Sequence, residues 1–323
     1  MMDGMDDGDS GAPLEVMDRL IAASGLPAPV SVQTIDSDGN GLDNRLMRAE
    51  LTDGRMVVMR QSRVATTSPR RRVDFLRANG INTPKLFASD DAGAALWEYI
   101  SGQTLADSVA NGTADRTAWR RTGAALAELH AVTFPASLEG TIDADSLSLR
   151  TTDPVESLLD NLAASGPWVE KHRPRLRGAL EHVRCFIADR ATQIRTARPS
   201  VLHGDVNLLN IVVNEDEARL IDWDFPRVGQ PLAELSALDE HAYLHGLDGL
   251  PSSFFEGYDR PVPRDLLLAY RIVGCIGWLA SGDWEEWDRA PELPDAARSR
   301  LDKWHQRLLD WSIGIPEVIT TLR

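Results

Sequence analysis

The sequence predicts a two-lobed α+β protein, in which a small antiparallel, β-rich lobe precedes a larger and mostly helical lobe. Its 323 residues suit about two domains of ~150 residues each. The first part of the chain holds short apolar runs separated by turn residues, which is typical of a small antiparallel sheet. After Gly102 the apolar residues recur at helical spacing, so the helical lobe is expected to begin there.

The β-rich lobe is expected to span residues 13–101, behind an acidic, disordered tail at residues 1–12. Apolar spacing predicts a helix at its start, and Pro69 with Gly80 marks the two ends of a second helix. The Thr-Asp-Gly turn at 52–54 between two alternating runs predicts a β-hairpin. In order, the expected elements are a helix over 14–23, strands over 31–35, 45–51 and 55–61, a helix over 70–78, and strands over 85–88 and 94–100.

The helical lobe is expected to span residues 102–323. Amphipathic patterns predict helices over 118–132 and 175–196. Two short apolar runs, 211–213 and 219–221, flank an acidic turn and predict a pair of strands. Residues from Leu232 onward are predicted to be mostly helical.

Composition excludes several classes of protein. With 43% hydrophobic and 26% charged residues, the chain is a folded globular protein rather than a disordered or fibrous one. Its two cysteines, Cys185 and Cys275, form no disulfide or zinc pattern, which suits a reducing compartment. The net charge of −15 disfavours nucleic acid as a partner. No apolar run has membrane-spanning length and no signal peptide is recognised, so a cytoplasmic protein without a membrane partner is expected.

Segment 201–224, VLHGDVNLLNIVVNEDEARLIDWD, carries the residues with the clearest chemistry. Asp205 and Asn210 fall on a loop, and Asp222 follows the returning strand. Phosphoryl transfer needs a carboxylate that accepts or orients the proton of the attacking hydroxyl. It also needs an oxygen side chain and a second carboxylate that hold Mg²⁺ against nucleotide phosphates. The pattern therefore predicts a catalytic loop with Asp205 and Asn210, and a metal site formed by Asn210 and Asp222.

This H-G-D-x-x-x-x-N…I-D-W pattern resembles the aminoglycoside phosphotransferase family, with its choline-kinase and macrolide-phosphotransferase relatives, within the protein-kinase-like fold. The resemblance covers residues 30–238 and keeps the Asp-to-Asn step of the kinase signature, but Gly204 replaces an Arg and Asp-Trp-Asp replaces D-F-G. It implies the two-lobed fold, ATP or GTP as phosphate donor, and Mg²⁺. The roles of Asn207 and Asp224 stay open.

In the small lobe, the resemblance implies a phosphate contact from Arg60, which stands where kinases carry a Lys. Kinases pair that Lys with a helix Glu, and the helix over 70–78 contains no Glu. Asp74 is its only acid, so Asp74 is the candidate partner of Arg60.

Two further nucleotide contacts are expected in the small lobe. Gly39 and Gly41, followed by Asn44, occupy the position of a phosphate-covering loop and allow the backbone to approach phosphate closely. Glu98 and Ile100 fall at the expected interlobe hinge, where backbone groups would bind the base.

The acceptor substrate is expected to bind helical-lobe residues that follow the metal-binding Asp. Carboxylates beside aromatic rings suit sugars, nucleosides or ammonium groups. The candidates are Asp239, Glu240, Trp278, Trp284 and Trp287, and the alternative is that these tryptophans pack in the helical core. Residues 203–292 carry 18 acids against six arginines, whereas residues 48–77 carry eight arginines against three acids. This polarity favours a cationic acceptor.

We therefore expect an ATP- or GTP-dependent O-phosphotransferase that acts on a hydroxyl of a small molecule, foremost an antibiotic of aminoglycoside, macrolide or nucleoside type inactivated by a resistance enzyme. A metabolic kinase for choline, an amino sugar or homoserine is the alternative. A non-catalytic, pseudokinase-like binding module is the third interpretation, because of the Lys-to-Arg change and the missing Glu. A monomer or a homodimer suits each of them.

Overall fold

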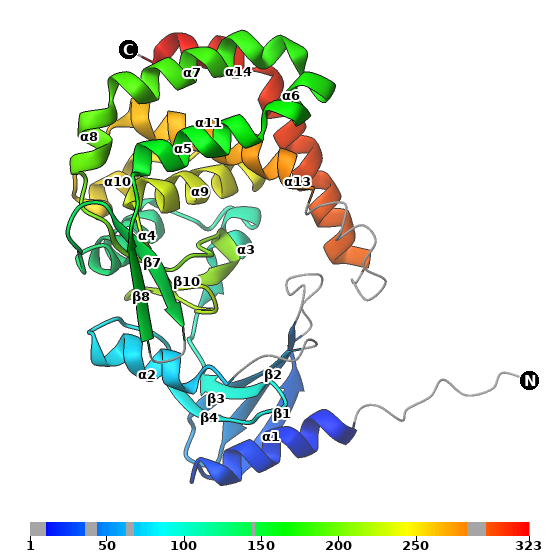
Figure 1. Ribbon diagram of the computed structural model, residues 1–323. Helices are drawn as coiled ribbons and strands as arrows, with labels where there is room; N and C mark the ends of the chain where they lie inside the picture. The colour runs from blue at the N-terminus through cyan, green and yellow to red at the C-terminus, as the bar shows by residue number, and fades with distance from the viewer. Residues whose placement is uncertain (1–10, 36–43, 63–67, 144–145, 283–294, 323) are drawn as a thin grey trace, which may run out of the picture. The chain divides into compact units, whose positions relative to one another are not determined.

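The computed structural model describes residues 11–35, 44–62, 68–143, 146–282 and 295–322 (Figure 1). The chain divides into two compact units, Met1–Ile100 and Ser101–Arg323. The first is an antiparallel sheet with two helices and the second is mostly helical, which confirms the predicted α+β class. Within the described ranges no helix is both long and apolar enough to cross a membrane.

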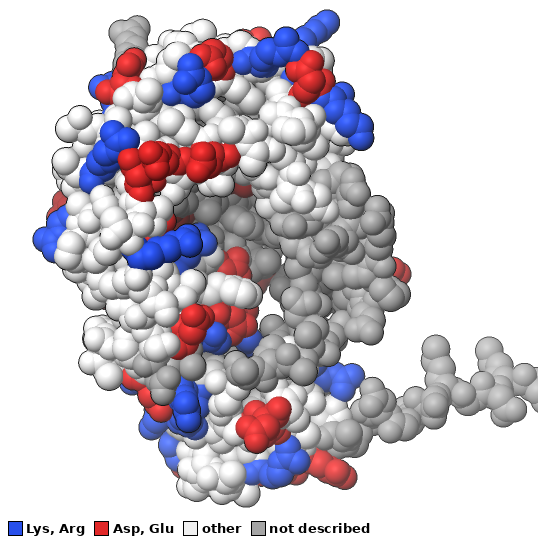
Figure 2. Space-filling model, viewed as in Figure 1, with Lys and Arg blue, Asp and Glu red and all other residues white. Residues whose placement is uncertain are grey.

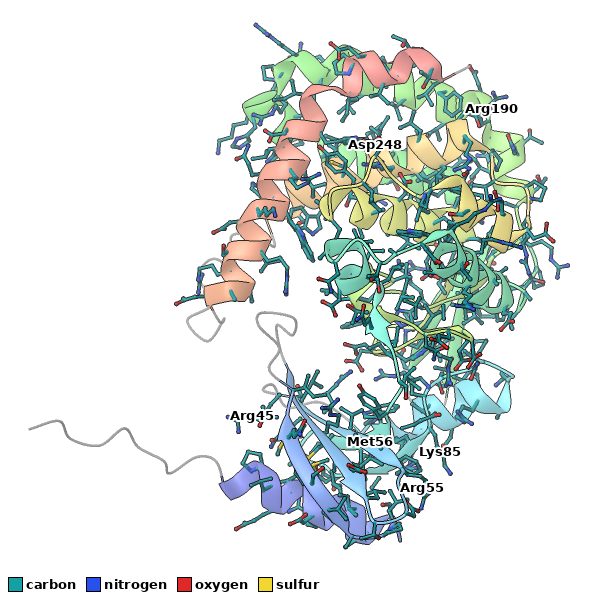
Figure 3. The ribbon with its side chains drawn as sticks, turned by 180° about the vertical axis from the view of Figure 1, so that it is seen from behind. Arg45, Arg55, Met56, Lys85, Arg190 and Asp248 are labelled. Atoms are coloured by element: carbon teal, nitrogen blue, oxygen red, sulfur yellow. The ribbon has the colours of Figure 1, made fainter. Side chains whose placement is uncertain are left out.

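A five-stranded antiparallel sheet forms the N-terminal unit, in the order β1-β2-β3-β5-β4. Arg45 and Arg55 mark the open end and the turn end of the β2–β3 hairpin (Figure 3). Every predicted strand of this unit is present within about two residues of its expected ends. The elements are α1 (Gly11–Ala23), β1 (Pro29–Thr34), β2 (Asn44–Leu51), β3 (Met56–Ser62), α2 (Arg70–Ala78), β4 (Leu86–Ser89) and β5 (Ala94–Glu98).

The two helices of this unit cover opposite faces of the sheet, because side chains alternate along a strand. On β5, Ala94 and Leu96 pack into the hydrophobic cluster that contains Met17 of α1. Ala95, which lies between them and points to the other face, packs with Val73 of α2. Both faces are thus buried, and the sheet forms a core of its own.

The C-terminal unit combines two small sheets with a large helical body. The sheets have the orders β11-β10-β6 and β8-β7-β12-β9. Their strands are β6 (Gln103–Thr104), β7 (Leu138–Asp143), β8 (Ser146–Thr151), β9 (Ser200–Leu202), β10 (Ile211–Val213), β11 (Ala218–Leu220) and β12 (Arg227–Gly229). The helices are α3 (Leu105–Ala110), α4 (Arg116–Leu129), α5 (Pro154–Ala164), α6 (Gly166–His172), α7 (Arg177–Asp189), α8 (Ala191–Thr196), α9 (Pro231–Leu244), α10 (Ser252–Tyr258), α11 (Arg264–Ser281), α13 (Asp295–Ile313) and α14 (Ile315–Val318).

Several features of this unit differ from the prediction, and α3, α5 and α6 were not predicted. The single helix predicted over 175–196 is divided into a 3₁₀ turn, α7 and α8, with a break at Arg190. Arg190 forms an ion pair of 3.0 Å with Asp265 of α11 (Figure 3). The sheet β8-β7-β12-β9 was not predicted, because β9 and β12 have only three residues each and β8 is almost fully exposed. Such strands are too short, or too polar, to show a two-residue alternation.

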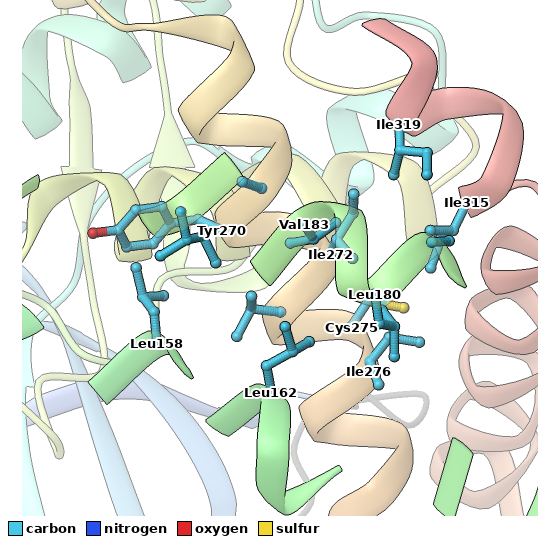
Figure 4. Packing of buried hydrophobic residues seen from close by; sticks show 14 of the residues in the cluster. Leu158, Leu162, Leu180, Val183, Tyr270, Ile272, Cys275, Ile276, Ile315 and Ile319 are labelled. Atoms are coloured by element: carbon cyan, nitrogen blue, oxygen red, sulfur yellow. The ribbon is translucent and has the colours of Figure 1, made fainter. Parts of the chain in front are cut away.

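The helical body packs around one hydrophobic cluster to which helices from α5 to α14 contribute. Val183 of α7 and Ile272, Cys275 and Ile276 of α11 are fully buried within it (Figure 4). The buried residues of α11 lie on nearly all sides of that helix, so α11 is the central element of the unit.

α4 and α10 approach each other at two glycines, Gly123 and Gly257. A Cβ at Gly123 would overlap the carbonyl oxygen of Phe254, and a Cβ at Gly257 would overlap that of Arg120. We expect Gly123→Ala to destabilise the protein by about 1–3 kcal/mol, because the added methyl group must push the helices apart. The matched control is Gly178→Ala on α7, where a Cβ meets no atom within 4 Å. It should be neutral or stabilising by ~0.5–1 kcal/mol. Denaturant unfolding measures both variants, and equal stabilities would contradict the close contact.

Candidate active site

The predicted catalytic loop leaves strand β9 and ends in a one-turn 3₁₀ helix, η2 (Leu208–Asn210). Asn210 Nδ2 donates to Asp205 Oδ2 at 3.0 Å and to the Asp205 carbonyl oxygen at 2.9 Å. Asn207 Nδ2 donates to Asp205 Oδ1 at 3.3 Å, while Asn207 Oδ1 accepts the N–H groups of Leu209 and Asn210. The structure therefore brings Asp205 and Asn210 together. Asn207 caps η2 and orients the Asp205 carboxylate.

Asp205 keeps an exposed surface, but its environment changes its acidity. Desolvation by the surrounding protein raises the pKa of the Asp205 carboxyl. The charge of His203 and the hydrogen bonds from Asn207 and Asn210 act in the opposite direction, and the negative charge of Asp224 raises the pKa further. A carboxylate with a raised pKa is a better proton acceptor than an ordinary one.

His203 connects the catalytic loop to the segment that follows β11. Its ring is fully buried, and Nε2 donates to the carbonyl oxygen of Ile221 at 2.8 Å. The ring also makes an edge contact with Trp223, whose Nε1 donates to the carbonyl oxygen of Leu220 at 3.0 Å. His203 thus joins the loop to the segment that carries Asp222.

The β10–β11 pair places Asp222 beside Asn210. The N–H of Ile221 donates to the Asn210 carbonyl oxygen at 2.9 Å, so Asp222 lies one residue beyond this contact. Asp222 has a left-handed φ of 64°, a conformation that non-glycine residues rarely adopt and that clusters at functional sites. Two residues predicted as metal ligands are therefore neighbours across a strand pair.

The donor set of this pair fits Mg²⁺ bound together with a nucleotide. Asn210 uses Nδ2 on Asp205, so Oδ1 is the atom of the amide that can serve as a ligand. Amide and carboxylate oxygens are Mg²⁺ ligands, and nucleotide phosphates usually supply further ones. In the part of the chain that the structure describes, no group of three or more His, Cys, Asp or Glu could hold a metal by itself. The phosphates would complete the coordination shell.

A buried hydrogen-bond chain anchors the catalytic loop to two helices. Glu234 of α9 accepts the Gly204 N–H on Oε1 at 2.9 Å, and its Oε2 lies 2.9 Å from His130 Nε2 at the end of α4. His130 Nδ1 in turn lies 2.8 Å from the Tyr258 hydroxyl. His130 is fully buried and Glu234 is 2% exposed. Burial alone would raise the pKa of Glu234, but His130, His203 and the Gly204 N–H lower it, which favours the ionised carboxylate.

Sequence reasoning missed Glu234. The available signal was an acid between the apolar neighbours Ala233 and Leu235, in the first turn of a helix that begins at Pro231. The sequence also did not reveal why a glycine is required at position 204. Gly204 has a φ of 87°, and a Cβ there would overlap the carbonyl oxygen of Phe225. The Arg of the kinase signature therefore cannot occupy this position.

The predicted phosphate contact lies in the N-terminal unit, apart from its predicted partner. Arg60 of β3 is paired between Leu46 of β2 and Ala95 of β5. Asp74 is exposed on α2, one residue after the buried Val73, and within the described ranges no hydrogen bond or ion pair joins it to Arg60. A step of one residue turns a side chain by about 100° around a helix, so Asp74 cannot share the sheet-facing side with Val73. The structure does not form the predicted pairing.

The remaining small-lobe candidates lie at element ends. Glu98 ends β5, and its Oε2 accepts the Lys85 N–H at 2.9 Å. Ile100 is the last residue of the N-terminal unit, and Asn44 is the first residue of β2. Four predicted residues lie outside the described part of the chain: Gly39, Gly41, Trp284 and Trp287.

A cavity of about 810 Å³ lies in the C-terminal unit, lined by the sheet β8-β7-β12-β9 and by α5, α9 and α11. Figure 2 shows a recess on this face of the unit. Glu240 and Trp278 line the cavity, and Trp278 also packs on the hydrophobic cluster. Burial raises the pKa of Glu240 to about 7. Asp239 lies outside the lining, since its Oδ2 pairs with Arg271 Nη1 at 2.6 Å and its Oδ1 accepts the Leu250 N–H.

Comparisons with known proteins agree with this geometry. Residues 34–260 match a family described as APH, the phosphotransferase enzyme family. Choline kinase LicA from Streptococcus pneumoniae is similar in structure, with 16% identity, a TM-score of 0.54, and coverage of 93% of this chain and 100% of that one. Macrolide 2'-phosphotransferase MphH from Brachybacterium faecium shares 20% identity, with a TM-score of 0.58 and coverage of 89% and 98%. Aminoglycoside phosphotransferase APH(4)-Ia shares 13% identity, with a TM-score of 0.57 and coverage of 92% and 98%. At these identities the likeness shows the fold. No curated protein matches the sequence.

Glu234 provides a stability test of the buried chain. Glu234→Ala leaves the Gly204 N–H and buried His130 without their partner, so we expect a loss of about 3–5 kcal/mol. The control is Glu256→Ala on α10, whose carboxylate forms a surface ion pair of 2.7 Å with Arg116. Such exposed pairs contribute about 0–1 kcal/mol. Equal losses for the two variants in denaturant unfolding would contradict the anchoring role of Glu234.

Proposed function

The chain belongs to the APH phosphotransferase enzyme family, and from this premise we propose that it transfers the γ-phosphate of ATP or GTP to a hydroxyl group of a small molecule. One observation carries the proposal. A partly desolvated Asp205 carboxylate is hydrogen-bonded to Asn210, and Asn210 is the strand-pair neighbour of the segment that carries Asp222. The candidate proton acceptor and the two candidate metal ligands thereby meet at one end of the catalytic loop.

In the proposed reaction, the acceptor oxygen forms a bond to the γ-phosphorus while the bond from that phosphorus to the β–γ bridging oxygen breaks. ADP or GDP leaves, and the hydroxyl proton passes to the Asp205 carboxylate. Asn207 and Asn210 hold that carboxylate in one orientation. Asn210 and Asp222 would hold Mg²⁺, which neutralises phosphate charge when it is bound.

Nucleotide contacts from the small lobe are part of the same proposal. Arg60 would contact the phosphates with a planar guanidinium in place of the ammonium group of a Lys. Gly39, Gly41 and Asn44 would cover the phosphates, and the backbone at Glu98 and Ile100 would bind the base. Asp74 is left out, because it is exposed and within the described ranges no hydrogen bond or ion pair joins it to Arg60.

The class of acceptor divides into two candidates. The similar structures named above include kinases whose names give choline, a macrolide and aminoglycosides, so a metabolite and an antibiotic both suit this fold. We propose a cytoplasmic enzyme, as a monomer or a homodimer, that either inactivates an antibiotic or phosphorylates a metabolite. A transfer assay over aminoglycosides, macrolides, nucleosides, choline, amino sugars and hydroxy acids, with product mass as readout, separates the two candidates.

Asp205→Asn tests the proposed reaction. The variant keeps the shape of the side chain but cannot accept the proton, so we expect kcat to fall by ~10²–10⁴-fold while nucleotide affinity stays within a few-fold. Asp216→Asn, an exposed position on the β10–β11 turn, is the matched control and should keep wild-type kinetics. A tenth or more of wild-type kcat in Asp205→Asn would contradict the role of this carboxylate.

Asp222→Asn tests the proposed metal ligand. Asn tolerates the left-handed backbone of this position and removes the negative charge, so the fold should be kept. We expect calorimetry to show weaker binding of the nucleotide with Mg²⁺ present and unchanged binding of the nucleotide with EDTA present. If the Mg²⁺ dependence of binding were equal in the variant and the wild type, Asp222 would not be a ligand.

A further inference from the structure

One wall of the 810 Å³ cavity is a single face of the sheet β8-β7-β12-β9. Across these strands Glu139 faces Arg150, and Thr141 faces both Ser148 and Arg227. Because side chains alternate along a strand, residues 139 and 141 of β7 point to the same face, and their cross-strand neighbours point with them. All five line the cavity. This wall therefore presents two guanidinium groups and one carboxyl group to a ligand.

Two buried side chains of the lining carry hydrogen-bond donors that have no acceptor among the described residues. Arg271 of α11 and Gln230, at the start of α9, are each 6% exposed and line the cavity. Arg271 Nη1 donates to Asp239, and the Arg271 guanidinium also lies over the rings of Tyr243 and Trp311. Arg271 Nε and Nη2 and Gln230 Nε2 have no hydrogen-bond partner among the described residues. Buried donors are rarely left without an acceptor, because each one costs free energy. Each of these donors can bind an acceptor oxygen of a ligand that occupies the cavity.

The charges that line the cavity agree with the donors. Arg150 and Arg227 are exposed residues of the lining, and the charges of both act on Glu139. Arg271 adds a third guanidinium to the lining. The lining also contains two acids, Glu139 and Glu240. Burial raises the pKa of Glu139 and raises that of Glu240 to about 7, which favours their neutral forms. A polyamine would meet repulsion here, whereas an anion would find charge-assisted donors.

The cavity lies next to the catalytic loop in the fold. Leu202 and Arg227 are cross-strand partners on β9 and β12, and both line it. Asp205 follows Leu202 by three residues, a reach of ~10 Å at most. Asp222 precedes Arg227 by five residues. A molecule of moderate length can therefore occupy the cavity and present a hydroxyl to Asp205.

We propose that this cavity holds the acceptor, and that the acceptor is a hydroxylated small molecule carrying a carboxylate rather than an amine. The proposal rests on the phosphotransferase function proposed above. Arg271 and Gln230 bind the carboxylate oxygens at depth, and Arg227 binds at the sheet face. This acceptor class differs from the cationic acceptor that the overall acidity of residues 203–292 predicts.

The test compares acceptors that share a skeleton and differ in one group. D-gluconate, D-glucitol and 1-amino-1-deoxy-D-glucitol form a linear set, and quinate, its methyl ester and its amide form a ring set. Choline and kanamycin represent the cationic acceptors. Thermal shift measures binding, and product mass with ADP or GDP release measures transfer. We expect the carboxylate members to stabilise the protein and to show at least a tenfold lower KM than their neutral or cationic partners. Stronger binding or transfer with the amines, or no response to either carboxylate at millimolar concentration, would overturn the proposal.

Variants of the lining locate the effect. Arg227→Ala should raise KM for the carboxylate at least tenfold and leave the nucleotide KM unchanged. Gln230→Leu removes a buried donor without an acceptor, so it should raise the melting temperature of the unliganded protein while weakening carboxylate binding. Arg175→Ala, an exposed arginine of the same unit outside the lining, is the matched control and should change neither quantity. If Arg175→Ala and Arg227→Ala had the same effect, general electrostatics would explain the preference and the cavity would not.

Asp205→Asn separates this proposal from the proposed function. Its cavity is intact, so it should bind the carboxylate in calorimetry as the wild type does while transfer is lost. Carboxylate binding that depends on Arg227 without any transfer by the wild type would support the cavity and overturn the phosphotransferase function. Transfer that depends on Asp205 and occurs only on amines or neutral alcohols would support the function and overturn the acceptor class.

Discussion

The placement of the catalytic loop depends on one buried carboxylate, that of Glu234. Its two oxygens bind two different parts of the chain. Oε1 accepts the Gly204 N–H of the loop, and Oε2 contacts His130 at the end of α4. An ion removed from water to this degree costs several kcal/mol unless both of its oxygens are satisfied. The loop, α4 and α9 must therefore keep their positions relative to one another. Asp205, one residue after Gly204, thus acquires a fixed place from a group that has no role in the proposed reaction.

Two strand pairs, β10–β11 and β9–β12, position different parts of the proposed site. The pair β10–β11 brings Asn210 to the segment of Asp222, and the pair β9–β12 leads from the cavity wall to Asp205. His203 joins the pairs through its hydrogen bond to Ile221. A displacement of either pair would move both the proposed metal ligands and the place where the proposed acceptor would meet Asp205. Short strands suit this purpose, because a three-residue pairing fixes register without extending the sheet.

The features that the sequence could predict are those governed by local spacing. The strands of the N-terminal unit alternate visibly, and one loop determines the step from Asp205 to Asn210. Partners distant in sequence were not accessible in this way: Glu234 and His130 are 104 residues apart. The predicted pairing of Asp74 with Arg60 failed for a different reason. A family resemblance indicates which helix follows the strand, but Val73 and Leu76 determine how that helix is rotated on the sheet.

The net negative charge of residues 203–292 does not predict the charge of the cavity, because the count includes acids far from the cavity. The count over residues 203–292 includes every acid, whether or not it lies near the cavity. Solvent and salt screen the electrostatic field of an exposed carboxylate such as that of Asp216. A ligand meets only the groups that line its cavity. There, burial affects acidic and basic side chains unequally. Burial raises the pKa of Glu240 to about 7, whereas guanidinium groups in proteins stay protonated. Desolvation thus removes negative charge from the lining sooner than positive charge, so a chain with a net charge of −15 can still enclose a cavity suited to anions.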